Sequence, residues 1–271
     1  EVFTYDAAGN LFTFEEHSGD ASSPVTSSSK STYDAQGNQL TLEEHETGDL
    51  DSPVTKQTIY TNFAPINQPL AREELVQPSY GFSTGNTTFD DACNGGTMHM
   101  LVDDGSNFGS DDEGFTATTI DSPVNFSFFG FIEPKFRVST NGWLSFGLVT
   151  RAALANFDMP HAGIPNSVIA PFWDDLENLV ICTKMISGSR LVVQWSGNVF
   201  GAPTETVSFQ TILDGADNNI EFVWGPTHVP DGRGEFATVG IEDQAAFNAK
   251  KRGFNTPNTT PTGTSLKFRP R

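Results

Sequence analysis

The sequence predicts an all-β protein, an antiparallel β-sandwich preceded by a small β-sheet built from repeats. The apolar residues include 23 Phe but only 4 Met and 4 Tyr. The 25 Gly and 16 Pro are spread along all 271 residues, which is typical of short strands separated by turns. The first 62 residues also contain an internal repeat. We therefore divide the chain into repeats (1–62), a connector (63–92) and a sandwich domain (93–271).

The repeat predicts β-hairpins. TYDAAGNLFTFEEHSGDASSPVT, from Thr4, returns as TYDAQGNQLTLEEHETGDLDSPVT, from Thr32, and KQTIYTN is a third, partial copy. Gly9-Asn10 and Gly37-Asn38 supply residues that tolerate the positive φ of a hairpin turn, and the runs after them alternate with the period of a strand. Large apolar residues are few, so we expect this sheet to pack on something else.

The segment 63–92 is predicted to be a connector, with helical turns in LAREELVQP between prolines. Strands are dense from Cys93 onward. The expected strands are VNFSFFG, KFRVST, WLSFG, SVIAPFW, LVICTKMI, RLVVQW, TVSFQTIL, IEFVW, ATVGIE and SLKF. Short helical turns are expected only at RAALAN and DQAAFNAKK. This spacing of strands and turns indicates a β-sandwich.

One hairpin can be predicted in detail. A three-residue loop, Thr140 to Gly142 with Gly142 left-handed, pairs Val138 with Leu144 on one apolar face. The other face then carries Trp143, which either packs under a loop or is exposed for binding.

The charge excludes two classes of partner. The chain has 34 Asp+Glu against 15 Lys+Arg, a formal net charge of -19, which repels nucleic acid and anionic membranes. No apolar stretch approaches the roughly 18 residues of a membrane span. We expect no nucleic-acid partner and no membrane insertion, and cations are favoured as ligands.

The two cysteines, Cys93 and Cys182, are too far apart for a CxxC metal or redox motif. In a secreted chain they would form one disulfide bond, which we prefer to two free buried thiols.

The stretch VIAPFWDDLE, residues 168–177, brings a buried strand to the surface at Asp174. Pro171 cannot donate to a ladder, so it is expected at an edge or a bulge. Adjacent strand residues point to opposite faces, so Asp174 and Asp175 are not expected to form an acid–base dyad. Calcium needs six to eight oxygens. The candidate calcium ligands are Asp174, Asp175, Glu177, Asp103 and Asp104, with the run 111–113 as a further source. Turn capping and a solvated acidic surface are the alternatives.

Enzyme signatures are absent from the sequence. It has no G-x-S-x-G elbow, no H-E-x-x-H motif and no glycine-rich phosphate loop, and its histidines are scattered singly. His17 and His45 occupy equivalent repeat positions and are expected to face solvent. We therefore expect no catalytic residues and no cofactor other than Ca²⁺.

The units YDAAGNL and YDAQGNQL resemble the YD repeats of bacterial surface and toxin-shell proteins. In that family the repeats are structural β-hairpins that wind into sheets and shells. The repeat spacing here is longer, so the shell architecture is not expected.

From Cys93 the motifs CNGGT, DDGSNFG, NFSFFG, VSTNGWLSFG, PNSVIAPFWDDLE, VVQWSG and VSFQTILDG follow in order. This order resembles a β-sandwich module of secreted bacterial proteins that is distantly similar to the nidogen-like domain of animal matrix proteins. The resemblance implies an extracellular, non-catalytic, structural or interaction role.

Three hypotheses follow. The first is a structural or adhesive protein, extracellular or on a bacterial surface, that self-assembles into a homo-oligomer or filament by strand pairing. The second is a carbohydrate- or matrix-binding module, calcium-dependent, from a larger secreted protein, in which Trp143 and Trp173 stack on a sugar. The third is a non-catalytic portion of a secreted hydrolase.

Overall fold

The computed structural model describes residues 2–7, 9–19, 22–33, 39–45, 56–63, 69–75, 79–147, 149–161, 163–228, 233–246 and 248–271, and these form strands and turns without an α-helix. The all-β prediction is confirmed. Among these residues no helix has the length and hydropathy of a membrane span. The chain divides into two compact units, Glu1–Pro78 and Ser79–Arg271.

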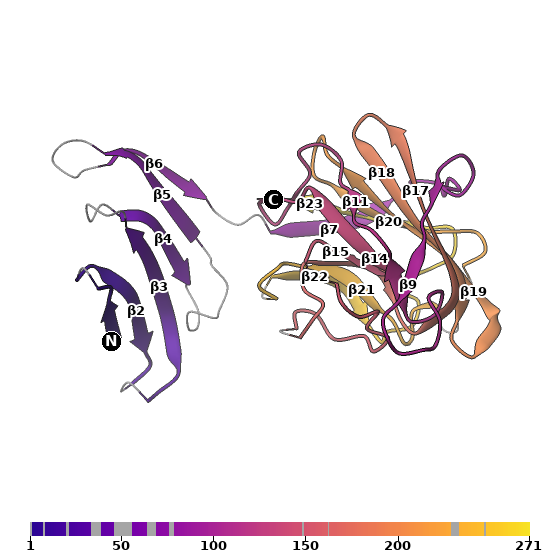
Figure 1. The fold of residues 1–271 in the computed structure, drawn as a ribbon, viewed down its shortest axis with the longest axis horizontal. Coiled ribbons are helices and arrows are strands. Elements are labelled where there is room, and N and C mark those ends of the chain that lie inside the picture. The colour runs from indigo at the N-terminus through magenta and orange to yellow at the C-terminus, as the bar shows by residue number, and fades with distance from the viewer. Residues whose placement is uncertain are drawn as a thin grey trace. The chain divides into compact units, whose positions relative to one another are not determined.

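The first unit is a six-stranded antiparallel sheet whose strands pair in chain order (Figure 1). Its strands are β1 (Val2–Tyr5), β2 (Leu11–His17), β3 (Val25–Tyr33), β4 (Gln39–His45), β5 (Lys56–Phe63) and β6 (Pro69–Leu75). In the first hairpin Gly9 has a φ of 86°, as predicted for its turn. The turn predicted at Gly37-Asn38 lies outside the described residues.

Strands β5 and β6 form a third hairpin repeat, which corrects the predicted connector. LAREEL, at 70–75, aligns with LTLEEH, at 40–45, and Thr61 pairs with Ala71 as Thr32 pairs with Thr41. The helical turns expected in LAREELVQP are wrong because β6 pairs with β5 along its length, and ladder pairing outweighs helix propensity.

The described side chains of this sheet show an unusual distribution. Phe3, Tyr5, Leu11 and Phe12 are exposed, whereas Thr13, Ser28, Ser31 and His45 are buried. The expectation that His45 faces solvent is therefore wrong. Within the described part of this unit, the sheet presents apolar rings rather than covering them.

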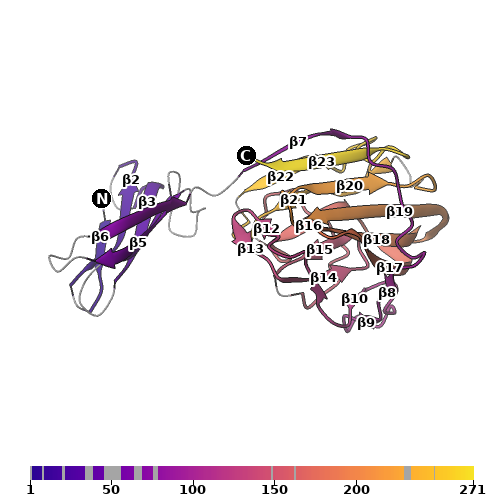
Figure 2. The ribbon, with the colours of Figure 1, turned by 90° about the horizontal axis from the view of Figure 1, so that it is seen from above.

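The second unit is a β-sandwich of two antiparallel sheets (Figure 2). One sheet contains β9 (Leu101–Asp103), β10 (Gly114–Thr116), β14 (Lys135–Ser139), β15 (Trp143–Ser145), β16 (Val168–Trp173), β21 (Thr238–Glu242) and β22 (Ala249–Phe254), with β11 (Ile120–Asp121) also paired to β14. The other contains β7 (Tyr80–Gly85), β8 (Thr97–Met98), β17 (Leu176–Ser187), β18 (Arg190–Val199), β19 (Ala202–Asp214), β20 (Ile220–Trp224) and β23 (Ser265–Pro270). A short hairpin joins β12 (Ser127–Phe128) to β13 (Phe131–Ile132).

The main core lies between the two sheets. Val138 and Ile169 from the first sheet pack in one buried cluster with Trp195, Phe209 and Phe222 from the second. Alternate residues of a strand point to opposite faces, so each sheet contributes one face to this core and keeps another for a second layer of contacts.

The predicted hairpin register is confirmed. Val138 pairs with Leu144, and Gly142 has a φ of 77° in the turn between β14 and β15. A Cβ atom at Gly142 would lie 1.7 Å from the carbonyl oxygen of Phe172, so the position requires glycine for space as well as for conformation.

Two expectations about the sandwich are corrected. It begins at Ser79 rather than Cys93, because β7 pairs with β23 over six residues, 80–85. DQAAFNAKK leads into strand β22, and RAALAN, at 151–156, is irregular. In these two segments strand pairing and loop packing decide the backbone conformation, and they outweigh the local preference for helical turns.

Candidate functional site

Asp174 and Asp175 lie where the chain crosses from one sheet to the other. Strand β16 ends at Trp173, and β17, in the second sheet, begins at Leu176. The ladder of β16 is interrupted between Ala170 and Trp173, so Pro171 lies where the strand does not need its missing N–H donor. Asp174 and Asp175 therefore form a two-residue link between the sheets, and Glu177 is the second residue of β17.

The two aspartates have different roles in this link. Asp174 accepts a hydrogen bond from the backbone N–H of Asp175 at 2.9 Å, and burial raises the pKa of Asp174 to about 6. The side chain of Asp175 instead meets residues from the loop between β9 and β10. The two carboxylates therefore have different surroundings, although the charge of Asp175 adds to the rise in the pKa of Asp174.

Asp103 ends β9 and Asp104 begins that loop, and both shape it through hydrogen bonds to backbone N–H groups. The Asp103 carboxylate accepts backbone hydrogen bonds from Gly105 at 2.7 Å and Gly109 at 3.0 Å, which lower its pKa. Asp104 accepts one from the backbone N–H of Ala152 at 3.0 Å. Asp103 therefore caps a turn, which is the alternative to calcium binding given above.

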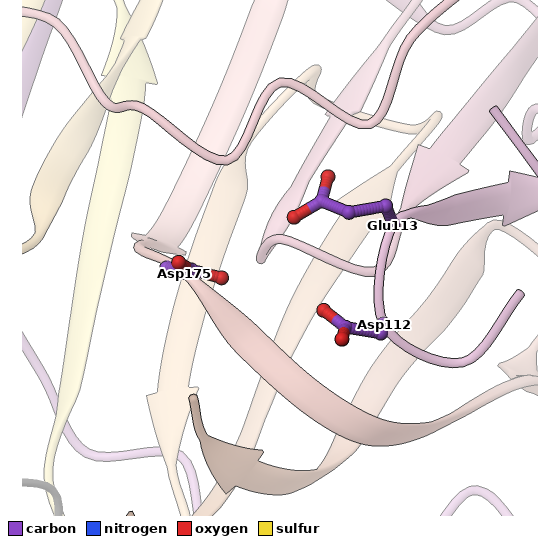
Figure 3. Close-up of side chains that lie close together, drawn as sticks. All are labelled: Asp112, Glu113 and Asp175. Atoms are coloured by element: carbon purple, nitrogen blue, oxygen red, sulfur yellow. The ribbon is translucent and has the colours of Figure 1, made fainter. Parts of the chain in front are cut away.

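The end of the loop supplies the candidate site. Asp112, Glu113 and Asp175 each place a carboxylate oxygen within 4.8 Å of the others, and Figure 3 shows their side chains converging. We call these three residues the acidic cluster. Of the five candidate calcium ligands only Asp175 belongs to it. Glu177 lies close enough for its charge to raise the pKa values of Asp112 and Asp175.

Asn141 holds the acidic cluster in place from the β14–β15 turn. Its side-chain amide donates to Glu113 Oε2 at 3.0 Å, and its oxygen accepts from the backbone N–H of Leu176 at 2.9 Å. Asn141 is fully buried. It thereby links the loop before β10 to the start of β17. The sequence signal for this role was Asn-Gly in STNGW, which we interpreted only as a turn.

The electrostatics of the acidic cluster disfavour three negative charges. Burial raises the pKa of Glu113 to about 7, and the charges of Asp175 and Asp112 add to the rise. Burial raises the pKa of Asp112 to about 6, with Asp175 and Glu177 contributing. Burial and Glu177 also raise the pKa of Asp175. A bound cation would remove this repulsion.

Two carboxylate oxygens of the acidic cluster lack hydrogen-bond partners. Oδ1 of Asp112 and Oδ1 of Asp175 are both inaccessible to solvent and accept no hydrogen bond within the described structure. A buried polar atom without a partner is costly unless something binds it. The oxygen-only donor set suits a hard cation such as Ca²⁺, which would need further oxygens beyond these three side chains.

A groove of about 270 Å³ adjoins the acidic cluster. Glu113 and Asp104 line it together with Phe157, Leu154 and Ile164. Leu154 and Ile164 are exposed. The site thus combines carboxylates with an accessible apolar surface.

The structure corrects the proposed sugar-stacking role of Trp143 and Trp173. Both indoles are almost fully buried, with centroids 5.9 Å apart, in a second core cluster on the outer face of the eight-stranded sheet. Trp143 Nε1 donates to the carbonyl of Ala152 at 3.0 Å, and Trp173 Nε1 to that of Ala153 at 2.7 Å. The loop after β15 covers both rings, so neither has a free face.

The cysteines form the predicted disulfide bond, Cys93–Cys182, with the Cα atoms 5.2 Å apart. It ties the segment before β8 to β17, one strand in from the edge of the seven-stranded sheet. The bond is consistent with an oxidising compartment.

Comparison with known proteins gives a family for the sandwich. Residues 79–270, most of the chain, match a family model described as NIDO related. No curated protein and no solved structure matches the chain. The match starts within one residue of the boundary between the two structural units and excludes the repeat sheet.

Proposed function

The chain belongs to the NIDO-related family, and from this premise we propose that it is a non-catalytic part of a larger secreted protein. The family is an extracellular adhesive or matrix type of module. In our proposal Ca²⁺ stabilises this module, which attaches the protein to its ligand. The observation that carries the calcium part is the acidic cluster. Asp112 and Asp175 each bury an oxygen without a hydrogen-bond partner, beside a carboxyl group of raised pKa.

Calcium at this position would tie two segments together. Asp112 and Glu113 precede β10, and Asp175 precedes β17 in the other sheet. A cation held by all three would join the sheets at one end of the sandwich and would order the wall of the adjoining groove. Ligand binding would then depend on calcium, because calcium would fix the shape of this end of the sandwich.

Thermal unfolding with and without calcium tests the proposal. Extracellular calcium modules bind with Kd of about 10⁻⁴ to 10⁻³ M, so 10 mM Ca²⁺ should stabilise the fold by about 1.4 to 2.7 kcal/mol. For a domain of this size that corresponds to a Tm rise of about 3 to 10 °C over the value in chelator. Mg²⁺ should have a smaller effect because it demands octahedral geometry.

Glu113→Gln and Glu205→Gln provide a matched pair of variants. E113Q should raise the Tm in chelator, because it removes a repelled charge, and should lose most of the calcium response. Glu205 lies on β19, outside the acidic cluster, and E205Q should respond like the parent chain. A calcium response that survives in E113Q, or is absent from the parent chain, contradicts the proposal.

Self-association is a second candidate, favoured by the exposed rings of the repeat sheet. Phe3 and Tyr5 are 46% and 63% exposed, and no second layer covers them in the described part of this unit. We propose that copies of the chain pack or pair through this sheet. Light scattering should show mass rising with concentration, and less so for F3S. F236S, which replaces an exposed ring of the sandwich, is the control. A chain that stays monomeric at high concentration refutes this candidate.

A further inference from the structure

A second groove lies on the outer face of the eight-stranded sheet, apart from the acidic cluster. Strand β14 buries Phe136 and Val138 in the main core, so Lys135 and Arg137 project from its other face. Together with Phe115, Thr119 and Thr150, among others, they line a groove of about 600 Å³. We call it the cationic groove.

The charge of this groove is opposite to that of the chain. The chain has a net charge of -19, yet the ionisable side chains that line the cationic groove are one lysine and one arginine, and none of the described lining residues is acidic. Lys135 lies at the exposed side and pairs with Asp121 on β11. Arg137 is therefore the principal charge available to a ligand.

The structure holds the Arg137 side chain in a defined position. Its guanidinium carbon lies 5.2 Å from the centroid of the Phe115 ring, and Nη2 donates to the carbonyl of Ala117 at 3.3 Å. This hydrogen bond uses one of the five guanidinium N–H groups. A guanidinium held by ring stacking and a backbone contact loses little freedom when it binds a ligand.

We propose that the cationic groove binds a carboxylate-bearing saccharide. A guanidinium pairs with a carboxylate through two parallel hydrogen bonds, which gives both strength and orientation. The exposed hydroxyl-bearing residues Thr119 and Thr150 offer partners for sugar hydroxyls. The volume lies within the range of small-ligand sites, enough for a few sugar units. Recognition here would use charge and hydroxyl groups, in place of the ring stacking that the buried tryptophans exclude.

The net charge of the chain limits what can bind. At 0.15 M salt the Debye length is about 8 Å, so the distant carboxylates are largely screened and contact with Arg137 dominates. At low salt the repulsion of a polyanion would extend further. Short acidic oligosaccharides at physiological salt are accordingly the right probes.

Titration of the whole chain with trigalacturonate, followed by amide chemical shifts in 0.15 M salt with chelator, tests this assignment. We expect saturable shifts at residues of β14 and at Thr119 and Thr150, with no response to the fully methyl-esterified trisaccharide. Chelator keeps the result independent of the calcium proposal, so either can fail without the other.

Two arginine variants and a lysine variant sharpen the test. R137Q should weaken trigalacturonate binding at least tenfold, since a charged hydrogen-bonded pair is lost, whereas K135Q should weaken it a few-fold. R269Q is the matched control, because Arg269 lies on β23 in the other sheet and bonds Ser83. If R137Q does not fold, K135Q and the shifts of the parent chain still decide.

The inference is overturned by any of three results. The first is that the parent chain shows no saturable shifts. The second is that the methyl ester binds as well as the acid, and the third is that R269Q weakens binding as much as R137Q. A triglutamate peptide that binds at least as tightly as trigalacturonate would also refute the saccharide assignment and indicate an acidic peptide instead.

Discussion

Asn141 shows how one buried amide organises the candidate site. It bonds a carboxylate from one loop and a backbone N–H from the first residue of β17, so its two ends satisfy groups from different sheets. Its hydrogen bond to Glu113 favours the charged form, opposing the burial that raises the pKa of Glu113. The acidic cluster is thereby kept partly ionised and available to a cation near neutral pH.

Replacing Asn141 by Ala should destabilise the fold by about 2 to 4 kcal/mol, because it leaves two buried partners unsatisfied. Urea unfolding in chelator measures the change. Asn156 also makes two side-chain hydrogen bonds, to Phe236 and Asn255, but at an exposed position. N156A should therefore cost less than about 1 kcal/mol. Equal losses of unfolding free energy in the two variants would show that burial of Asn141 does not increase its contribution to stability.

Among the elements, β17 connects the acidic cluster to the disulfide bond. It starts at the inter-sheet link beside the acidic cluster, and further along it carries Cys182. On one side it pairs with β18 over most of its length, and on the other the two residues of β8 pair with it, with further backbone hydrogen bonds from His99 and to Asp111. The disulfide bond therefore anchors the short edge strand β8, whose ladder to β17 has only two residue pairs.

The variant C93S/C182S should lower the free energy of unfolding. The bond closes a loop of 89 residues, for which the chain-entropy estimate is about 4 to 5 kcal/mol. The strands of the sandwich should persist, because β17 keeps its ladder to β18. Urea unfolding followed by circular dichroism measures both the loss and the retained fold. An unfolding free energy equal to that of the parent chain would contradict the estimate.

At the scale of the whole molecule, the sandwich has its own strands and its own hydrophobic core, as an independent domain does. In the part of the chain that the structure describes, the strands β7 to β23 all lie after Ser79, and the three buried clusters draw on residues of that unit. The family match covers the same span. Folding of the sandwich should not require the repeat sheet.

A fragment of residues 79–271 should unfold at the same temperature as the sandwich in the full chain. A fragment of residues 93–271, which starts at the boundary we first predicted, should be strongly destabilised. It lacks β7, which pairs with β23, and it lacks the ring contact between Tyr80 and Phe129. Calorimetry of both fragments checks this. Equal stability of the two would show that β7 is dispensable.

Local pattern by itself determined most of the sandwich strands and the turn between β14 and β15, whereas the disulfide bond was expected from the extracellular character of the chain. Alternation and glycine placement gave the β14–β15 register, because they depend on residues within one hairpin. The third repeat is also present in the sequence, where LAREEL parallels LTLEEH. Its residues favour a helix locally, and the ladder to β5 decides that it forms a strand.

Only the tertiary structure decided which carboxylates meet and which aromatic rings are covered. Asp112 and Asp175 are 63 positions apart in the printed sequence, and the crossing between sheets brings them together with Glu113. Trp143 and Trp173 are buried because the loop around Ala152 and Ala153 folds over them. Such contacts join segments that are distant in sequence, so neither periodicity nor composition specifies them. The β-sandwich was predictable from local patterns, and its acidic cluster and cationic groove arise from how its strands and loops pack.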